Sequence, residues 1–432
     1  MTRRKHPWAP LAAALFALSF GSGWGGCGSG SRGASSPPPN PGPPPDPGAT
    51  PTATQHDIVV GPGFTDVGPH QLVRTHANLL YVVVPTCFAF DPDCGDNEIK
   101  VYRATSAGTP SGFDEKDGGH APRGGISTVA IAMDGDDQIH AIWNDRGGAV
   151  RYALFDTRSD LWGDAEVVDS THWTDFKQGD EGVALALDAA GTPHAVWSVR
   201  GDDGRLHLRY ANRAGGGWRD RHDVDDVIDC DPPSSACSAW HPATAFTAAE
   251  TLVVSWLDGT GAYTHDGVVR VRRRDKGGSW TPSERIEDPA ESGLDNGPSL
   301  LVTPDGLVHL TFCGSRTNQI RYWYDAGAGF RGDRQPPVQV THDPSLGPDR
   351  SGGVFIYGHG DPGADISGHG NDLFFFHLSP GSSWDPWTRY QKGSYDSSVS
   401  TRWSQFFHFH PEEIDVAYWA DSYPNVAHLG VN

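Results

Sequence analysis

The chain has 432 residues, which is enough for two or three ordinary domains or for one repeat array. Its formal net charge of -21 argues against a nucleic-acid backbone as partner, because phosphate binding needs clustered Lys and Arg. A surplus of carboxylates is ordinary for a soluble exported protein.

The first segment, residues 1–27, has a basic start and an apolar run from about Ala9 to Phe20. This run is too short to span a bilayer and has the length of a signal-peptide core. The ending Trp24-Gly25-Gly26-Cys27 resembles a bacterial lipoprotein signal, although that family usually carries an aliphatic residue where Trp24 stands. The resemblance implies that Cys27 is lipidated and becomes the mature N-terminus. Plain secretion is the alternative.

Residues 28–55 are rich in Gly, Ser and Pro and have no means of forming a core. We expect a disordered tether that carries one folded domain, residues 56–432. The protein is then exported and held in the cell envelope through the lipid anchor alone, facing the periplasm or the cell exterior. We expect a monomer.

The remaining cysteines fit an oxidising compartment. Cys87 and Cys94 flank one short polar loop, and Cys230 and Cys237 flank another with the same spacing. Two local disulfides are predicted, with a metal site as the rival interpretation. Cys313 is left over and is expected to be a free thiol.

An aromatic residue recurs at the end of a strand-like segment. The first four occurrences, 54 to 59 residues apart, are Trp143, Trp197, Trp256 and Phe312. The fifth, Trp419, follows after a gap about twice as long. Each unit contains four segments of alternating apolar and polar residues separated by Gly, Asp and Asn turns. Such units predict an all-β, seven-bladed β-propeller. The expected blade starts are Gly68, Gly124, Asp180, Trp240, Asn296, Arg350 and Ser397.

The last unit lacks a fourth strand, and Asp57 to Val60 looks like an outer strand. We therefore expect the N-terminal strand to complete the last blade and close the ring. Six blades is the alternative, if Gly68 to Asp117 packs differently.

Certain polar residues also recur at fixed places in the repeat. His140, His194 and His309 each precede the aromatic residue by three positions, and an Arg-Tyr pair recurs on the following strand. A role that is repeated in blade after blade indicates packing and hydrogen bonding rather than catalysis.

The units resemble the BNR-type repeats of sialidase-like β-propellers from exported bacterial proteins. One copy of this repeat motif consists of Asp305-Gly306, Val308-His309, Ile320, Tyr322 and Gly329-Phe330. Another copy consists of Asp134-Gly135, Ile139-His140, Trp143, Val150 and Tyr152. The resemblance covers most of the chain from His56.

In a propeller, the loops that enter the inner strands share one face with the loops that join the second and third strands, and binding residues concentrate on such loops. Aromatic rings stack on sugars, and polar groups hold their hydroxyls. The predicted ligand-binding residues at this face are His172, Trp173, Glu181, Trp240, His241, Asn296, Arg350, Arg402 and Trp403. They predict a glycan or an envelope or extracellular protein as ligand.

Sialidase chemistry needs an Arg cluster, a Tyr nucleophile assisted by Glu, and an acid Asp. Candidates for the Arg cluster are Arg74, Arg316, Arg350 and Arg402, and Glu181 with Tyr395 for the nucleophile pair. The family's Arg-Ile-Pro start and Ser-x-Asp-x-Gly-x-x-Trp boxes are missing, so no catalytic residue is assigned and a non-catalytic binder is favoured. A sialidase-like hydrolase or lyase is the alternative, and an assembly scaffold without a small ligand is a third.

The sixth unit contains a Gly-rich stretch with His359, Asp361 and His369. These residue types bind divalent metals, but their spacing matches no known motif and a solvated loop is favoured. The sequence predicts no metal or other cofactor.

Overall fold

The computed structural model describes residues 54–59, 71–86, 98–116, 121–145, 147–170, 182–230, 233–260, 267–286, 298–303, 305–314, 319–332, 342–348, 353–359, 373–378, 384, 388–391, 413–420 and 423–430. In this part of the chain the elements are β-strands, apart from one 3-10 turn, η2 (Ala214–Gly216). None of its helical residues forms a segment long and apolar enough to cross a bilayer.

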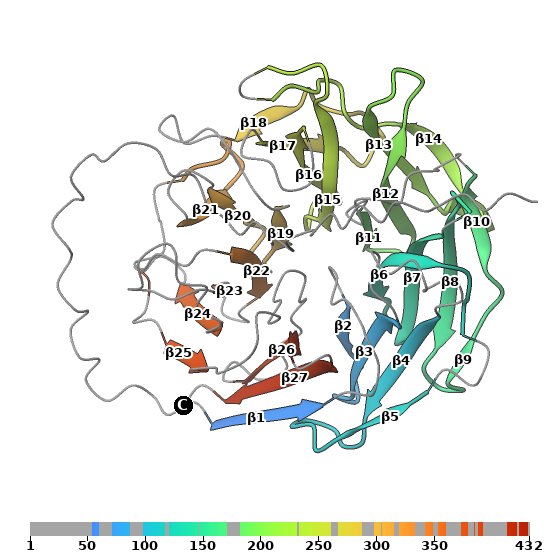
Figure 1. Ribbon diagram of the computed structural model, residues 1–432, viewed down its shortest axis with the longest axis vertical. Coiled ribbons are helices and arrows are strands. Elements are labelled where there is room, and N and C mark those ends of the chain that lie inside the picture. Colours follow the sequence, from blue (N-terminus) through green and yellow to red (C-terminus); the bar gives the residue numbers. More distant parts are fainter. Residues whose placement is uncertain are drawn as a thin grey trace, which may run out of the picture.

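The strands of the described residues form seven antiparallel sheets arranged around a common centre (Figure 1). The first three sheets are built from consecutive strands: β2 (Leu72–Arg74), β3 (Leu80–Pro85), β4 (Ile99–Ala104) and β5 (Phe113–Glu115); β6 (Ile126–Met133), β7 (Gln138–Asp145), β8 (Val150–Asp156), β9 (Leu161–Trp162) and β10 (Glu166–Asp169); β11 (Val183–Leu187), β12 (Pro193–Arg200), β13 (Leu206–Asn212) and β14 (Arg219–Asp223).

The next three sheets follow the same plan: β15 (Ser238–Phe246), β16 (Leu252–Gly259), β17 (Val268–Arg274) and β18 (Glu284–Ile286); β19 (Ser299–Val302), β20 (Val308–Gly314) and β21 (Gln319–Asp325); β22 (His342–Pro348), β23 (Val354–His359), β24 (Leu373–Leu378) and β25 (Thr388–Gln391). The first strand of each sheet lies nearest the centre (Figure 1).

The seventh sheet joins the two ends of the described chain. Its order is β1 (Thr54–Val59), β27 (Tyr423–Gly430), β26 (Glu413–Ala420). β1 pairs with β27 over its whole length, from Thr54 opposite Gly430 to Val59 opposite Asn425. The predicted β-propeller is confirmed, as is the closing strand, which begins three residues before Asp57. Six sheets of consecutive strands and this closing sheet correspond to the seven units counted in the sequence.

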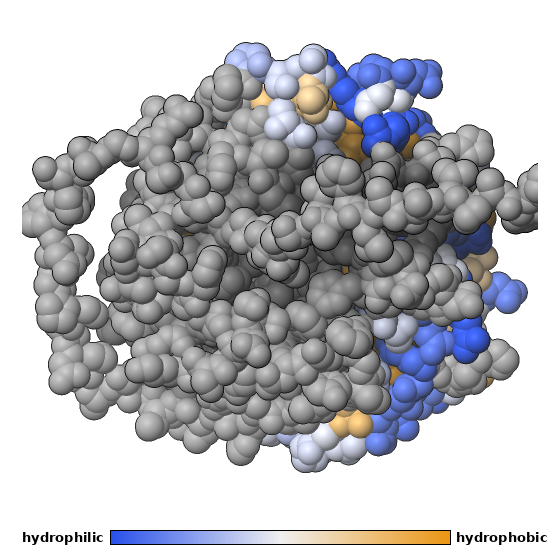
Figure 2. Space-filling model, viewed as in Figure 1, coloured by the Kyte–Doolittle hydropathy of each residue, from blue (hydrophilic) through white to orange (hydrophobic). Residues whose placement is uncertain are grey.

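The exposed surface of the described residues is mainly polar. Those visible in Figure 2 are mostly hydrophilic, with scattered apolar residues among them. The large hydrophobic side chains exposed in this part of the chain are Leu161, Val167 and Val227, which lie on three different segments.

Neighbouring sheets pack through alternate residues of the same strand. In β16, Val254 and Trp256 pack against the third sheet, and Val253 and Leu257 pack against the fifth. Each sheet buries both of its faces because side chains of a β-strand point alternately to opposite sides. This is why one four-stranded unit alone would be unstable and why the repeat forms a ring.

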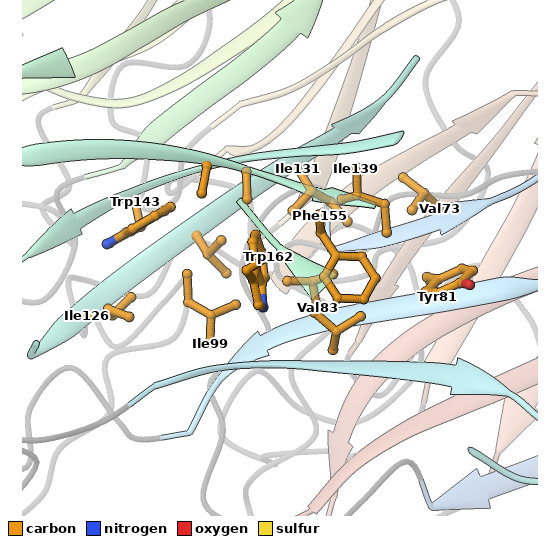
Figure 3. Close-up of a cluster of buried hydrophobic side chains, with 14 residues drawn as sticks. Val73, Tyr81, Val83, Ile99, Ile126, Ile131, Ile139, Trp143, Phe155 and Trp162 are labelled. Carbon is orange, nitrogen blue, oxygen red and sulfur yellow. The ribbon is translucent and has the colours of Figure 1, made fainter. Parts of the chain in front are cut away.

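The recurring aromatic residue faces the preceding sheet. Trp143 belongs to the cluster between the first and second sheets, together with Tyr81, Phe155 and Trp162 (Figure 3). Trp197 and Trp256 repeat this position in the next two interfaces, and both are fully buried. Burial of aromatic surface at each interface supplies much of the stabilisation of the ring.

The recurring His residues form buried hydrogen bonds with Tyr on the next strand. The distance from His Nδ1 to Tyr Oη is 2.7 Å in all three pairs, which are His140–Tyr152, His194–Tyr210 and His309–Tyr322. Burial lowers the pKa of His309 to about 4, so its ring is neutral at physiological pH. These contacts confirm the structural role predicted for the repeated His.

Candidate functional site

Three segments meet at one end of the third and fourth sheets. They are the β12–β13 hairpin turn (201–205), the last residues of strand β16, and the connection from β14 to β15 (224–237). In an antiparallel propeller blade these connections share a face. Residues 224–237 contain four Asp and no Lys or Arg. The predicted disulfide between Cys230 and Cys237 is present and closes a short loop in this connection.

A buried ionic network fastens the 224–237 connection to the fourth sheet. Asp258, at the end of β16, accepts hydrogen bonds from Trp256 Nε1 (2.8 Å) and Arg270 Nε (2.7 Å). Arg270 Nη2 also donates to Asp229, and the backbone N–H of Asp229 donates to Asp258 Oδ2 at 3.1 Å. Burial raises the pKa of Asp258 to about 7, despite the hydrogen bonds that favour its charged form.

The same connection also reaches the third sheet through a histidine. His207, at the start of β13, has its Nδ1 2.7 Å from Asp225 Oδ2, and its Nε2 3.1 Å from Asp203 Oδ1. The side chain of Asp225 is 1% exposed, that of His207 is 26% exposed and that of Asp203 is 48% exposed. One carboxylate therefore holds the imidazole from inside the protein, and the other lies on its solvent side.

The electrostatics of the Asp225–His207–Asp203 cluster favour a protonated ring. Burial alone lowers the pKa of His207, but attraction to Asp225 and hydrogen bonds to both carboxylates outweigh burial and raise it. Burial also raises the pKa of Asp225, against the hydrogen bond of 2.7 Å from the Leu208 N–H to Asp225 Oδ1. A partly exposed imidazole that is held in this way is suited to proton transfer.

Two of the predicted ligand-binding residues fall on β15. Trp240 is buried in the core between the fourth and fifth sheets, and its Nε1 donates to the Gly259 carbonyl at 2.9 Å. The prediction of an open stacking platform is thus wrong for Trp240, because its ring faces are already packed. His241 is also buried and has a positive φ of 49° at a bulge in β15, so it shapes the backbone there.

The sixth sheet begins earlier in the chain than predicted. Its inner strand is β22, which ends at Pro348, before the expected blade start at Arg350. Arg350 itself lies outside the described residues.

The remaining predicted ligand-binding residues, His172, Trp173, Glu181, Asn296, Arg402 and Trp403, lie outside the described residues. So do Cys27, Cys87, Cys94, Asp361 and His369, together with the side chains of Cys313 and His359. Among the described residues, no group of three or more His, Cys, Asp or Glu has the arrangement of a metal site.

Arg74, a candidate for a carboxylate-binding Arg cluster, instead holds a turn of the first sheet. Its Nη1 donates to the carbonyls of Asn78 (3.0 Å) and Gly108 (2.9 Å) and to the Asn78 side chain (3.0 Å). Its side chain is buried in these contacts. This geometry assigns Arg74 to the scaffold.

His207, Asp203 and Asp225 were not among the residues predicted from the sequence. The signal available was the polar turn Gly201-Asp202-Asp203-Gly204, which ends three positions before His207, and the Asp-rich connection further along the chain. Nothing in either segment indicates which Asp meets the ring, since Asp225 lies 18 positions further along the chain.

Neither protein-family models nor curated protein sequences match this chain. Among solved structures, it is similar to an ulvan lyase, described as a new family of polysaccharide lyase and bound to -[GlcA(1-4)Rha3S]-. The TM-score is 0.50 at 12% identity, covering 85% of this chain and 94% of the lyase. This similarity shows a common fold.

Two further solved structures are similar at lower TM-scores. The polysaccharide lyase Uly1 has a TM-score of 0.48 at 11% identity, covering 87% of this chain and 99% of that one. The Hadza microbial sialidase Hz136 has a TM-score of 0.45 at 11% identity, covering 79% and 75%.

Proposed function

We propose that the protein binds a polysaccharide at the loop face of its propeller and cleaves it, as a glycoside hydrolase or a polysaccharide lyase. The observation that carries this proposal is the partly exposed Asp225–His207–Asp203 cluster, which pairs an oriented imidazole with a solvent-facing carboxylate. Cleavage by either route needs a proton donor or acceptor beside the glycosidic bond. The fold shared with an ulvan lyase supports the choice of a polymer as substrate.

A non-catalytic glycan binder is the second candidate. Asp and His side chains of the loop face are suited to hold sugar hydroxyls without any reaction. The absence from the sequence of the sialidase family's Ser-x-Asp-x-Gly-x-x-Trp boxes favours this candidate over a sialidase.

The two candidates are separated by one screen. The purified domain, residues 52–432, is incubated with ulvan, arabinan and a sialylated glycoprotein, and new reducing ends, unsaturated uronates and free sialic acid are measured. We expect cleavage of at least one polymer and no release of sialic acid. Gel retardation by a polymer without cleavage would favour the binder, and neither binding nor cleavage would contradict both candidates.

We further propose that the protein is exported and anchored to a membrane through Cys27, since the sequence before it has the features of a lipoprotein signal. Cys27→Ala in the full chain is expected to move the protein from the membrane fraction to the soluble fraction. A carbonate wash followed by immunoblotting measures this distribution. Unchanged membrane association of the variant would rule out lipidation at Cys27 as the anchor.

A further inference from the structure

We infer that His207 is a catalytic residue that protonates the leaving oxygen of the substrate, and that Asp225 is the residue that positions it. This inference rests on the proposed function and names the group that performs its chemistry. Among the described residues, His207 combines a buried carboxylate on Nδ1 with a half-exposed carboxylate on Nε2. The buried His140, His194 and His309 of the repeat instead bond to Tyr on the Nδ1 side and lie in the core.

The ring of His207 is fixed by Asp225 on one side and by Gly201 on another. Asp225 Oδ2 accepts from Nδ1, and this assigns the second proton of the imidazolium to Nε2. Asp225 is itself held by the Leu208 N–H. The ring also lies against Gly201, where an added Cβ would come within 2.6 Å of Cδ2 and 2.8 Å of Nε2. Glycine at 201 is therefore required for this ring position.

The charged groups that face the ring are both acidic. Asp225 approaches from the 224–237 connection and Asp203 from the β12–β13 turn, where Arg205 lies 3.8 Å from Asp203. Two carboxylates stabilise the imidazolium, and the exposed one is the group that a bound sugar would displace from Nε2. Both contacts therefore favour the imidazolium, which is the form that can donate a proton to the substrate.

The proton balance holds for either cleavage reaction. The imidazolium gives its Nε2 proton to the glycosidic oxygen as that oxygen leaves as a hydroxyl group. In hydrolysis, water adds to the anomeric carbon and the proton that it loses restores the imidazolium. In elimination, the new double bond forms as a proton is removed from the carbon next to the uronate carboxylate, and this proton restores the imidazolium.

The first test is His207→Asn in the whole propeller domain, assayed on the polymer that the wild-type protein cleaves. The amide nitrogen of Asn reaches the place of Nδ1 and keeps the hydrogen bond to Asp225, but it has no titrating proton. We expect kcat to fall by about 100- to 10,000-fold with little change in KM. Retention of polymer binding in gel retardation would show that the variant is folded.

The second test uses the pH profile, which a merely structural role would not change. For wild type, activity should fall as pH rises through the raised pKa of His207. Asp225→Asn removes the main attraction that raises it, so the fall in kcat/KM should move to lower pH. Gly201→Ala changes no charge but displaces the ring from the two carboxylates, so it should lower kcat and also move the profile to lower pH.

The matched control is His76→Asn. His76 also pairs through Nδ1 with an Asp, Asp137, at 2.8 Å, but it is 75% exposed and lies in the β2–β3 connection of the first sheet. Its kcat should equal that of wild type. Full activity of His207→Asn, or an unmoved pH profile in Asp225→Asn, would overturn the role of His207 and leave the proposed function standing. A wild-type protein that cleaves nothing would overturn both.

Discussion

Replacing Arg270 by methionine is expected to destabilise the propeller by about 3–5 kcal/mol, because it leaves the buried carboxylate of Asp258 without its charged partner. Arg270 donates to Asp258 at 2.7 Å and also to Asp229, and the Asp258 side chain is fully buried. Without the guanidinium, Asp258 must either stay charged in the core or take up a proton. The free energy of unfolding from urea titration at pH 8 measures the loss.

The pH dependence of this loss provides a further check. The pKa of Asp258 is about 7 in the intact protein, and removal of Arg270 raises it further. The variant should therefore lose less stability at pH 5, where Asp258 is protonated and needs no cation, than at pH 8. A loss that is equal at both values would contradict the assignment of the cost to a buried charge.

The control for Arg270 is Arg285→Met on the neighbouring strand β18. Arg285 lies 3.9 Å from the same Asp229, but its side chain is about one-third exposed. Water screens such a pair, so the expected loss is below about 1 kcal/mol. A loss at Arg285 that matched the loss at Arg270 would show that the packing of the long side chains, rather than their charge, is what counts.

The repeat and the ring were predictable because their information is local. Alternation with a period of two reveals strands, and the recurring Trp143, Trp197 and Trp256 reveal the interfaces that they fill. The structural role of the repeated His was predictable for the same reason, because a position used in several sheets serves what the sheets have in common. The fold was therefore accessible without any homologue.

Two strand starts were misjudged for identifiable physical reasons. β15 begins at Ser238, two residues before the predicted start at Trp240, so Trp240 entered the core instead of the loop. The sequence of β22 is His-Asp-Pro-Ser-Leu-Gly-Pro, and its two Pro and one Gly are unfavourable in strands. The segment was therefore not recognised as a strand, and the start of the sixth blade was predicted at Arg350 instead. Both errors came from applying strand propensity to an inner strand that tertiary packing stabilises.

The candidate site could not be predicted because its contacts are not local. His207 meets Asp225 across a whole outer strand, and Arg270 meets Asp229 across 41 positions of sequence. The sequence shows only that Asp is abundant in residues 224–237. Which Asp is buried, and which ring it orients, depends on how the connection is fastened by Arg270 and the Cys230–Cys237 disulfide.

Removing β1 is expected to open the ring and to lower the melting temperature by roughly 10 °C, since several kcal/mol of strand pairing and sheet packing are lost. β1 pairs with β27 at six consecutive positions, from Thr54 to Val59. A chain that starts at residue 61 leaves the edge of β27 without its partner, and such an edge also promotes aggregation. Differential scanning calorimetry and light scattering measure the two effects.

The matched control is a chain that starts at residue 52, which lacks residues 1–51 but keeps β1. It should melt at the same temperature as the longer protein. A synthetic peptide of residues 52–61 added to the shorter chain should restore much of the lost stability, because an extended peptide can pair with an open strand edge through main-chain hydrogen bonds. Equal melting of the two truncated chains would mean that the ring holds together without β1. In that case its stability would come from packing between the other sheets.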